Sequence, residues 1–230
     1  MRSASVAAGG PVFEGDHAGI TSGPPLPLAL AFVDGVQPIN AAEAAAVVVA
    51  HHYLHRRPPI SHAFGWFRNG ALLGAVTYGV PASRYLQKSA CPSDPDLVLE
   101  LNRLWVHDDE PRNTESRFVA ATLRALPARI IVSYADTAYG HVGYIYRALS
   151  WRYAGWTDMD RKTPRFDYLP VSGGHSRDAF RGGWNGTQRR KPKVKYWTTT
   201  GTPAQRRTLA GRCGWPSLDW RTTPPPGGTP

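Results

Sequence analysis

The chain has little cysteine, no long apolar run and no apolar leader. Its two cysteines, Cys91 and Cys213, exclude a disulfide scaffold and a cysteine-rich zinc ribbon. The longest apolar runs, residues 26–33 and 44–50, are far too short to cross a bilayer, so we expect no membrane partner. Small and polar residues follow the first two residues where a secretory signal would carry an apolar segment, and we therefore expect a cytoplasmic protein.

Acidic residues are scarce in only one part of the chain. Residues 1–160 hold 13 Lys and Arg against 14 Asp and Glu, whereas residues 161–230 hold 14 against three. The net charge of +10 therefore comes entirely from the C-terminal part. A near-neutral body with a strongly basic extension favours a nucleic-acid partner, because Lys and Arg neutralise backbone phosphates. The alternative is a solvated basic tail without a partner.

Apolar residues make up 42% of the chain, enough to bury one sizeable core and to exclude wholesale disorder. Periodicity and turn signals predict alternating strands and helices. Strands are predicted at residues 28–33 (closed by an Asp34-Gly35 turn), 63–67, 71–78, 97–106, 129–135, 151–157 and 194–200. Helices are predicted at residues 40–55, 113–126, 140–149 and 205–212, and loops at 80–96 and 158–192.

This order predicts an α/β (α+β) fold with a mixed central sheet flanked by helices. The expected parts are a flexible leader (1–28), a core (29–160), a basic loop insertion (161–192), a closing strand (193–200), and a basic helix with a disordered tail (201–230). The element order resembles the GNAT-type acyltransferase fold. That resemblance implies that two middle strands splay apart and hold the acyl donor between them.

Six motifs in sequence order narrow this resemblance. They are His51-His52-Tyr53, Thr77-Tyr78-Gly79, Leu99-Glu100-Leu101-Asn102-Arg103-Leu104-Trp105-Val106, Pro111-Arg112-Asn113-Thr114-Glu115-Ser116, Ser133-Tyr134-Ala135-Asp136 and Gly143-Tyr144-Ile145-Tyr146. Together they resemble the Mom DNA-modification proteins of Mu-like bacteriophages. The resemblance implies transfer of a carbamoylmethyl group to adenine N6 in double-stranded phage DNA, which protects that DNA from restriction in the host cytoplasm.

The sequence does not identify the donor of the transferred group. The glycine-bearing pyrophosphate loop of acetyltransferases is missing, and the carboxylates of Asp108, Asp109 and Glu110 stand in its place, where they would repel a pyrophosphate. The first candidate donor is an activated glycine, and glycyl-tRNA is the leading form of it. This makes tRNA a candidate partner. The second candidate donor is an acyl-CoA. A homodimer is also expected. The alternative functions are a GNAT-type N-acetyltransferase that uses acetyl-CoA on a protein or small amine, and a non-catalytic nucleic-acid-binding protein.

Four residues are candidate catalytic groups. Asp136 ends a β-branched strand, where open sheets bind ligands, and its carboxylate can accept a proton from an amine, although capping of the next turn is the alternative. Arg103 interrupts an apolar strand, so its charge needs a partner or a ligand. Ser116 lies in a first helical turn, where free N–H groups favour an anion. The resemblance implies that Tyr146 protonates the leaving group of the donor.

Further candidates bind substrate, donor or DNA. Asn113 shares the helix start with Ser116, with ordinary capping as the alternative. Tyr134, Tyr139 and Tyr144 offer aromatic faces and polar groups to a flipped adenine, with packing in the core as the alternative. A dense basic run is expected to contact DNA phosphates: Arg189, Arg190, Lys191, Lys193 and Lys195.

A metal site is a further expectation. His51 and His55 are four residues apart on a predicted helix, a spacing that can hold a metal from one face. The family resemblance implies bound iron, with His52, Tyr53, Tyr78 and Asp136 as its ligands. The alternative is that helix-end histidines interact with the helix dipole.

Overall fold

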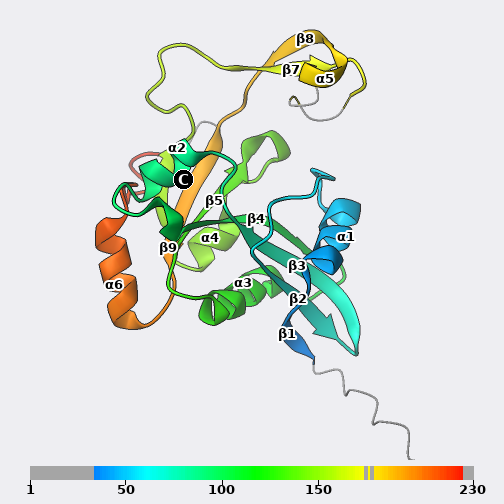
Figure 1. Cartoon of the computed structure of the whole chain (residues 1–230), viewed down its shortest axis with the longest axis vertical. Coiled ribbons are helices and arrows are strands. Elements are labelled where there is room, and N and C mark those ends of the chain that lie inside the picture. The colour runs from blue at the N-terminus through cyan, green and yellow to red at the C-terminus, as the bar shows by residue number, and fades with distance from the viewer. Residues whose placement is uncertain (1–33, 174–175, 177–178, 225–230) are drawn as a thin grey trace, which may run out of the picture. The chain divides into compact units, whose positions relative to one another are not determined.

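We describe a computed structural model in which residues 34–173, 176 and 179–224 are placed (Figure 1). These residues belong to one compact unit, residues 33–230. The predicted leader, the predicted strand at 28–33 and residues 225–230 of the predicted tail lie outside the described residues. In the described part of the chain, no helix has the length and apolar character needed to span a membrane.

The placed elements form a mixed α/β fold, as predicted. One sheet takes the order β1-β2-β3-β4-β5-β9-β6, and β7 and β8 form a separate hairpin. The strands are β1 (Gly35–Pro38), β2 (His62–Arg68), β3 (Ala71–Gly79), β4 (Val98–Val106), β5 (Ile130–Asp136), β6 (Arg152–Trp156), β7 (Phe166–Pro170), β8 (Trp184–Arg189) and β9 (Lys193–Thr199). The helices are α1 (Ala41–His51), α2 (Arg84–Ala90), α3 (Thr114–Ala125), α4 (Tyr144–Ala148), α5 (Ala179–Gly182) and α6 (Pro203–Arg212), with short 3-10 turns η1 (Pro95–Leu97) and η2 (Thr137–Tyr139).

Local sequence signals explain the first half of the sheet. The Asn40 side chain accepts a hydrogen bond from the Glu43 N–H at 2.8 Å and so caps α1. Asn69 and Gly70 both adopt positive φ, at 51° and 76°, as a two-residue hairpin turn between β2 and β3 requires. Both features were predicted, whereas the expected Asp34-Gly35 turn is wrong because Gly35 begins β1.

The middle of the sheet holds its only parallel pair among the described strands. β4 and β5 are paired over three positions only, from Val98 with Ile130 to Glu100 with Val132. Beyond these positions the backbones part, and the Ser133 hydroxyl bridges the gap by donating to the Leu101 carbonyl oxygen at 2.8 Å. The predicted splay of the middle strands is therefore present.

Each face of the sheet carries its own apolar core, because side chains alternate along a strand. Leu99 and Ile131 point into a cluster with Phe118 of α3, while Val98 and Ile130 point into a second cluster. The second cluster includes α2, Leu209 of α6, fully buried Cys91 and partly buried Cys213, which are both free thiols. Figure 1 shows α6 alongside β9 and the β7–β8 hairpin set away from the sheet.

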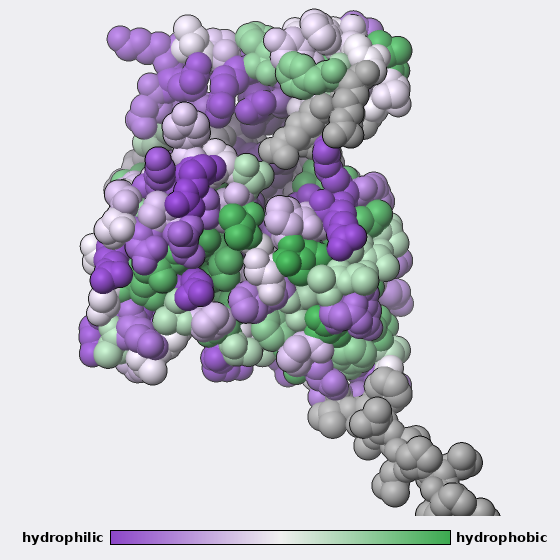
Figure 2. Space-filling model, in the orientation of Figure 1, coloured by the Kyte–Doolittle hydropathy of each residue, from purple (hydrophilic) through white to green (hydrophobic). Residues whose placement is uncertain are grey.

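Two predicted loops contain regular structure. The loop predicted at 80–96 holds α2, a helix of seven residues whose Ala90 is fully buried, so tertiary packing stabilises a segment too short to be helical alone. The loop predicted at 158–192 holds the β7–β8 hairpin and α5. Its large apolar side chains, such as Phe180 and Trp184, are mostly exposed, so no clean alternation of buried and exposed positions marks these strands. In the view of Figure 2, green hydrophobic patches lie over the hairpin and α5.

Candidate active site

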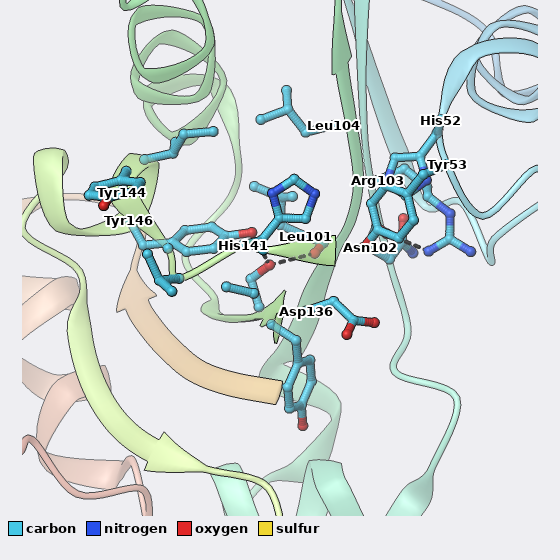
Figure 3. Close-up of a pocket in the computed structure, with 17 residues that line it drawn as sticks. His52, Tyr53, Leu101, Asn102, Arg103, Leu104, Asp136, His141, Tyr144 and Tyr146 are labelled. Carbon is cyan, nitrogen blue, oxygen red and sulfur yellow. Dashed lines mark hydrogen bonds between the residues drawn. The ribbon is translucent and has the colours of Figure 1, made fainter. Parts of the chain in front are cut away.

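A cavity opens where β4 and β5 part. It has a volume of about 240 Å³ and is lined from β4, the end of β5, the segment leading into α4, and the residues after α1. Figure 3 shows Tyr144 and Tyr146 on one side, and His52, Tyr53 and Arg103 on the other. Carboxyl ends of parallel strands in open sheets are common ligand sites, and Asp136 lies at such an end.

Tyr146 and Ser133 close the inner end of the cavity. The Tyr146 hydroxyl lies 2.7 Å from Ser133 Oγ, which also donates to the Leu101 carbonyl. The Tyr146 ring packs 5.0 Å from the rings of both Trp151 and Tyr196. Burial raises the pKa of Tyr146 to about 12, although the hydrogen bond between Tyr146 and Ser133 opposes part of that shift. The phenol therefore stays protonated at neutral pH and can donate a proton or a hydrogen bond.

Gly143 explains the first position of the Gly143-Tyr144-Ile145-Tyr146 motif. It adopts a φ of 86°, and a Cβ placed there would lie 2.3 Å from Cε2 of Tyr196. The Tyr196 hydroxyl donates to the Val142 carbonyl oxygen at 2.8 Å, so this close approach is fixed by a hydrogen bond. Only glycine meets both requirements, and it places Tyr146 against the ring of Tyr196.

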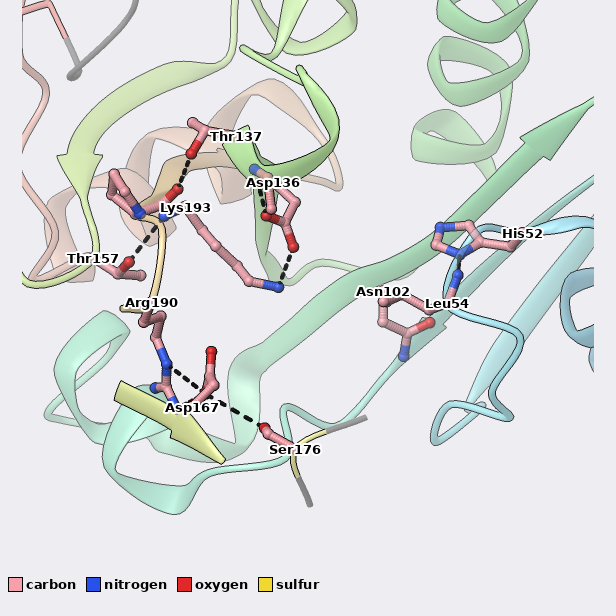
Figure 4. A network of polar contacts seen from close by, with 12 residues as sticks. His52, Leu54, Asn102, Asp136, Thr137, Thr157, Asp167, Ser176, Arg190 and Lys193 are labelled. Carbon is pink, nitrogen blue, oxygen red and sulfur yellow. Dashed lines mark hydrogen bonds and ion pairs between the residues drawn. The ribbon is translucent and has the colours of Figure 1, made fainter. Parts of the chain in front are cut away.

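Asp136 is buried, with 5% of its surface exposed, and both of its carboxylate oxygens are engaged (Figure 4). Oδ1 accepts from the Ala138 N–H at 3.0 Å, which is the predicted alternative role as a cap of the following turn. Oδ2 lies 2.6 Å from Nζ of Lys193, its direct register partner on β9. Each oxygen keeps a second lone pair that can accept from a ligand.

An aromatic wall faces Asp136. Tyr53 stacks on His52 with ring centroids 4.1 Å apart, lies 4.2 Å from Tyr139, and is 5.4 Å from His141. Burial lowers the pKa of His52 to about 4, and Nδ1 of the neutral ring accepts from the Leu54 N–H at 3.1 Å. Burial, followed by the nearby Asp136 carboxylate, raises the pKa of Tyr53 well above its usual range. The stacked rings of His52 and Tyr53 are thus uncharged at neutral pH and suit stacking on a base.

Arg103 brings a cation to the same cavity. Its Nη1 donates to the Asn102 carbonyl oxygen at 2.5 Å, while its Nε is buried without a hydrogen-bond partner among the described residues. Burial lowers the pKa of this guanidinium, yet arginine remains charged in proteins. A buried donor without a partner costs about 1–3 kcal/mol, so Arg103 is suited to meet a ligand.

Not every predicted residue reaches the cavity. The Ser116 hydroxyl donates to the Asn113 carbonyl oxygen at 2.9 Å within the first turn of α3, and neither residue lines the cavity. Asn113 adopts a left-handed φ of 69° and its side chain makes no cap. Tyr134 borders the cavity, but its ring packs edge-on against Trp215. Tyr144 also borders it and is 70% exposed.

Of the four donors predicted for iron, His52, Tyr53 and Asp136 line the cavity, whereas Tyr78 does not. Tyr78 is fully buried and its hydroxyl lies 2.6 Å from Thr122 Oγ1 in the core. Nδ1 of His52 is occupied by the Leu54 N–H, and Asp136 is paired with Lys193. His55 turns its Nδ1 to the Val49 carbonyl, 3.0 Å away, and His51 stacks on Trp105. Within the described ranges, no group of three or more His, Cys, Asp or Glu side chains could hold a metal ion.

The basic run from 189 to 195 is largely engaged within the protein. Arg190 pairs with Asp167, Lys193 pairs with Asp136, and the Lys195 ammonium lies 5.4 Å from the centre of the Trp215 ring. Arg189 and Lys191 are exposed. The count of charges in the sequence therefore overstates how many of these cations face solvent.

The acidic turn after β4 is also partly neutralised. The Glu110 carboxylate accepts from Trp66 Nε1 at 2.7 Å and pairs with Arg68 at 2.6 Å, and its side chain is only 3% exposed. Asp108 and Asp109 are exposed. Two carboxylates, not three, would therefore repel a pyrophosphate at this turn.

Sequence reasoning missed two contributors to the site. His141 stands in the aromatic wall, but it follows a 3-10 turn in a segment with no diagnostic spacing. The Ser133 hydroxyl forms hydrogen bonds with the Leu101 carbonyl oxygen and the Tyr146 hydroxyl. These bonds form at the point where β4 and β5 part, which the sequence alone does not locate. Lys193 was expected at DNA, and its pairing with Asp136 depends on a register between residues far apart in the sequence.

The fold and the cavity define a mixed α/β protein with an aromatic, carboxylate-bearing pocket between splayed strands. The chain belongs to the Mom protein family, whose pattern matches residues 35–210. It is 28% identical over 127 residues to the methylcarbamoylase mom of Escherichia phage Mu. That match covers 52% of this chain and 53% of the relative, so the chain spans about half the length of the curated relative.

Solved structures of acetyltransferases resemble the chain more distantly. A putative acetyltransferase of Salmonella typhimurium, solved with its cofactor acetyl-CoA, is 10% identical with a TM-score of 0.43, covering 73% of this chain and 94% of its own. A polyamine N-acetyltransferase of Drosophila melanogaster is 13% identical with a TM-score of 0.43, covering 71% of this chain and 98% of its own.

Proposed function

We propose that this protein is a DNA-modifying transferase that places a carbamoylmethyl group on N6 of adenine in phage DNA. The observation that carries the proposal is the cavity in which the Asp136 carboxylate and the protonated Tyr146 phenol meet the stacked, uncharged rings of His52 and Tyr53. Membership of the Mom family and the name of the phage Mu relative support the same activity.

The groups in the cavity suit the transfer of an activated acyl group to an amine. An adenine flipped out of the duplex stacks on the wall formed by Tyr53 and His52. N6 attacks the acyl carbon of the donor, and Asp136 accepts the proton that N6 loses. The bond from the acyl carbon to the leaving group breaks, and Tyr146 supplies the proton that the leaving group takes up. Arg103, with its unpaired Nε, stabilises negative charge on the donor.

The donor in this proposal is an activated glycine. A glycyl group on N6 contains the same atoms as a carbamoylmethyl group. The product forms without an oxidant if N6 moves from the carbonyl carbon to the methylene carbon while the glycine amino nitrogen moves from the methylene carbon to the carbonyl carbon, so that two carbon–nitrogen bonds break and two form. Glycyl-tRNA leads because an aminoacyl ester needs no pyrophosphate loop, and the turn after β4 still presents Asp108 and Asp109. An acyl-CoA is the runner-up, because pairing of Glu110 with Arg68 weakens the repulsion expected there.

The test is direct analysis of modified nucleosides. DNA from cells that express the chain is digested, and adenosine masses are measured for the wild type, Asp136→Asn and Asp160→Asn. The last variant is matched, because it neutralises an exposed carboxylate outside the cavity and outside the turn after β4. We expect a carbamoylmethyl mass in the wild type and Asp160→Asn, and a loss of about 100-fold or more in Asp136→Asn. Equal modification by all three proteins contradicts the role of Asp136.

A reconstitution separates the donors. Purified protein, duplex DNA, labelled glycine and charged tRNA are combined with and without ribonuclease. Label that reaches adenine only without ribonuclease supports the tRNA route, whereas label that requires added acyl-CoA excludes it. An acetylated protein or amine in place of modified DNA would support the acetyltransferase alternative. A homodimer remains a prediction that no contact in the described residues tests.

A further inference from the structure

A second cavity lies at the other end of the β5–β9 ladder. We call it the α6 groove. It has a volume of about 320 Å³ and runs between α6, the start of β6 and the end of β9. Its lining residues are Ser150, Arg152, Thr198, Thr199, Pro203, Arg206, Arg207 and Ala210. Three arginines and three hydroxyl groups, with no carboxylate in the lining, make a groove that attracts anions.

The arginines of the groove are free to bind. Arg206 and Arg207 are exposed, and among the described residues neither side chain takes part in an ion pair or a hydrogen bond. Arg152 is held in place, because its guanidinium lies 4.5 Å from the centre of the Trp197 ring. The planar guanidinium fork matches the geometry of phosphate oxygens and binds them in pairs.

The end of α6 does not itself supply the binding groups. Thr202 Oγ1 accepts from the Gln205 N–H, and the Gln205 side chain accepts from the Thr202 N–H, so a capping box already satisfies this terminus. The Thr199 hydroxyl donates to the Arg206 carbonyl oxygen at 3.2 Å and links the helix to β9. Ligand contacts therefore fall to the arginine side chains and to the remaining hydroxyls of Ser150 and Thr198.

The groove and the active-site cavity are far apart. Thr199 pairs with Ile130 at the start of β5, whereas Lys193 pairs with Asp136 at its end. Six strand steps of about 3.3 Å separate these pairs by about 20 Å. A small molecule in one cavity does not reach the other, whereas a polymer with a regular array of phosphates is long enough to span this distance. At one charge per about 1.7 Å, duplex DNA presents on the order of ten phosphates over this distance.

We propose that the α6 groove binds the phosphodiester backbone of the duplex whose adenine enters the active-site cavity. The inference rests on the proposed function, which makes duplex DNA the substrate. It places the phosphate contact on Arg206, Arg207 and Arg152, away from the basic run at 189–195, in which three of five cations are engaged within the protein. Binding there positions the duplex without reading its sequence.

The test is equilibrium binding of a fluorescent duplex across a range of salt concentrations. Arg206→Gln/Arg207→Gln is compared with Arg124→Gln/Arg212→Gln, which removes the same charge from exposed positions outside the groove, one of them on the same helix. We expect the groove variant to bind the duplex about ten-fold to a hundred-fold more weakly at low salt. Its salt slope should fall by about two, because each lost phosphate contact removes about one unit. The control variant should resemble the wild type.

Two further measurements test the proposal. Arg206→Lys/Arg207→Lys should keep most of the salt slope, because phosphate attraction needs the charge, while losing part of the affinity that the paired guanidinium contacts supply. A tRNA competitor distinguishes the two nucleic acids: the loss should be greater for the duplex than for tRNA, and the reverse result overturns the assignment to DNA. Equal affinities and slopes for groove and control variants overturn the groove itself, even if the wild type modifies DNA. Failure of the wild type to modify adenine, with the groove effect intact, instead counts against the proposed function.

Discussion

The cationic side chains at the two ends of the β5–β9 ladder differ in whether they form ion pairs. At the cavity end, Lys193 is held by Asp136, and Arg190 beyond it is held by Asp167. At the groove end, Arg206 and Arg207 have no such partners among the described residues. Both ends contribute to the same excess of positive charge in the sequence. The difference shows that net charge indicates a polyanionic partner but does not locate the surface that binds it.

The largest expected effect on stability comes from disturbing the packing at the cavity end of the ladder. Gly143→Ala should destabilise the fold by about 3 kcal/mol or more, because a Cβ at 2.3 Å from the Tyr196 ring adds to the cost of a φ of 86°. Chemical denaturation measures the change in the free energy of unfolding. A change below about 1 kcal/mol would show that Tyr196 moves aside, and that the cavity end is less rigid than its contacts indicate.

The second prediction uses the titration of His52. Its pKa is about 4 in the folded protein and about 6.5 when unfolded, so the unfolded chain binds more protons between these values. The stabilisation is complete above pH 6.5 and is lost as the pH falls towards 4, by at most about 3 kcal/mol. Protonation also ends the acceptor role of Nδ1 towards the Leu54 N–H. Denaturation of wild type and His52→Gln at pH 7 and pH 5 measures this, and parallel losses in both would contradict it.

The third prediction tests whether the Asp136–Lys193 pair stabilises the cavity end. Lys193→Met leaves a carboxylate that is 7% exposed without its cation, while the lysine side chain is 38% exposed, so water moderates the effect. We expect a loss of about 1–2 kcal/mol in the free energy of unfolding, and recovery in Lys193→Arg. Lys191→Met serves as the matched control, because Lys191 is exposed. If both methionine variants behave alike, the ion pair contributes no stability.

The smallest predicted effect lies at the groove end and has the opposite sign. Gly211 is helical, has an ordinary φ, and a Cβ there would meet nothing within 4 Å. Gly211→Ala should therefore stabilise the protein by about 0.5–1 kcal/mol, since alanine loses less backbone freedom on folding. Thermal unfolding checks this. Destabilisation would indicate that α6 packs more tightly than its exposed positions show.

Much of the sheet could be predicted from short-range signals. The Asn40 cap and the Asn69-Gly70 turn depend on neighbours in the sequence, and both are present. The helix α2 and the β7–β8 hairpin could not be predicted, because one is stabilised by distant packing and the other exposes its apolar residues.

The candidate site could be predicted only in part, because some of its contacts join residues far apart in the sequence. Asp136, Tyr146 and Arg103 were identified by motif and do line one cavity, whereas Ser116 and Asn113 lie outside it. Which basic residues are available depends on strand register: Asp136 and Lys193 meet only because β5 and β9 pair. No local pattern encodes that pairing. The α6 groove also could not be predicted, because most of its lining residues come from β6, β9 and α6, which only the fold brings together.

The thiol of Cys213, at the end of α6, is shielded in the folded protein. Cys213 caps the helix, and its N–H donates to the Leu209 carbonyl oxygen at 3.1 Å. Burial raises the pKa of this thiol to about 11, so almost none of it is the reactive thiolate at neutral pH while the helix is docked. Cys91 is fully buried. Alkylation of Cys213 at neutral pH should therefore be slow in the folded protein and fast in the unfolded chain.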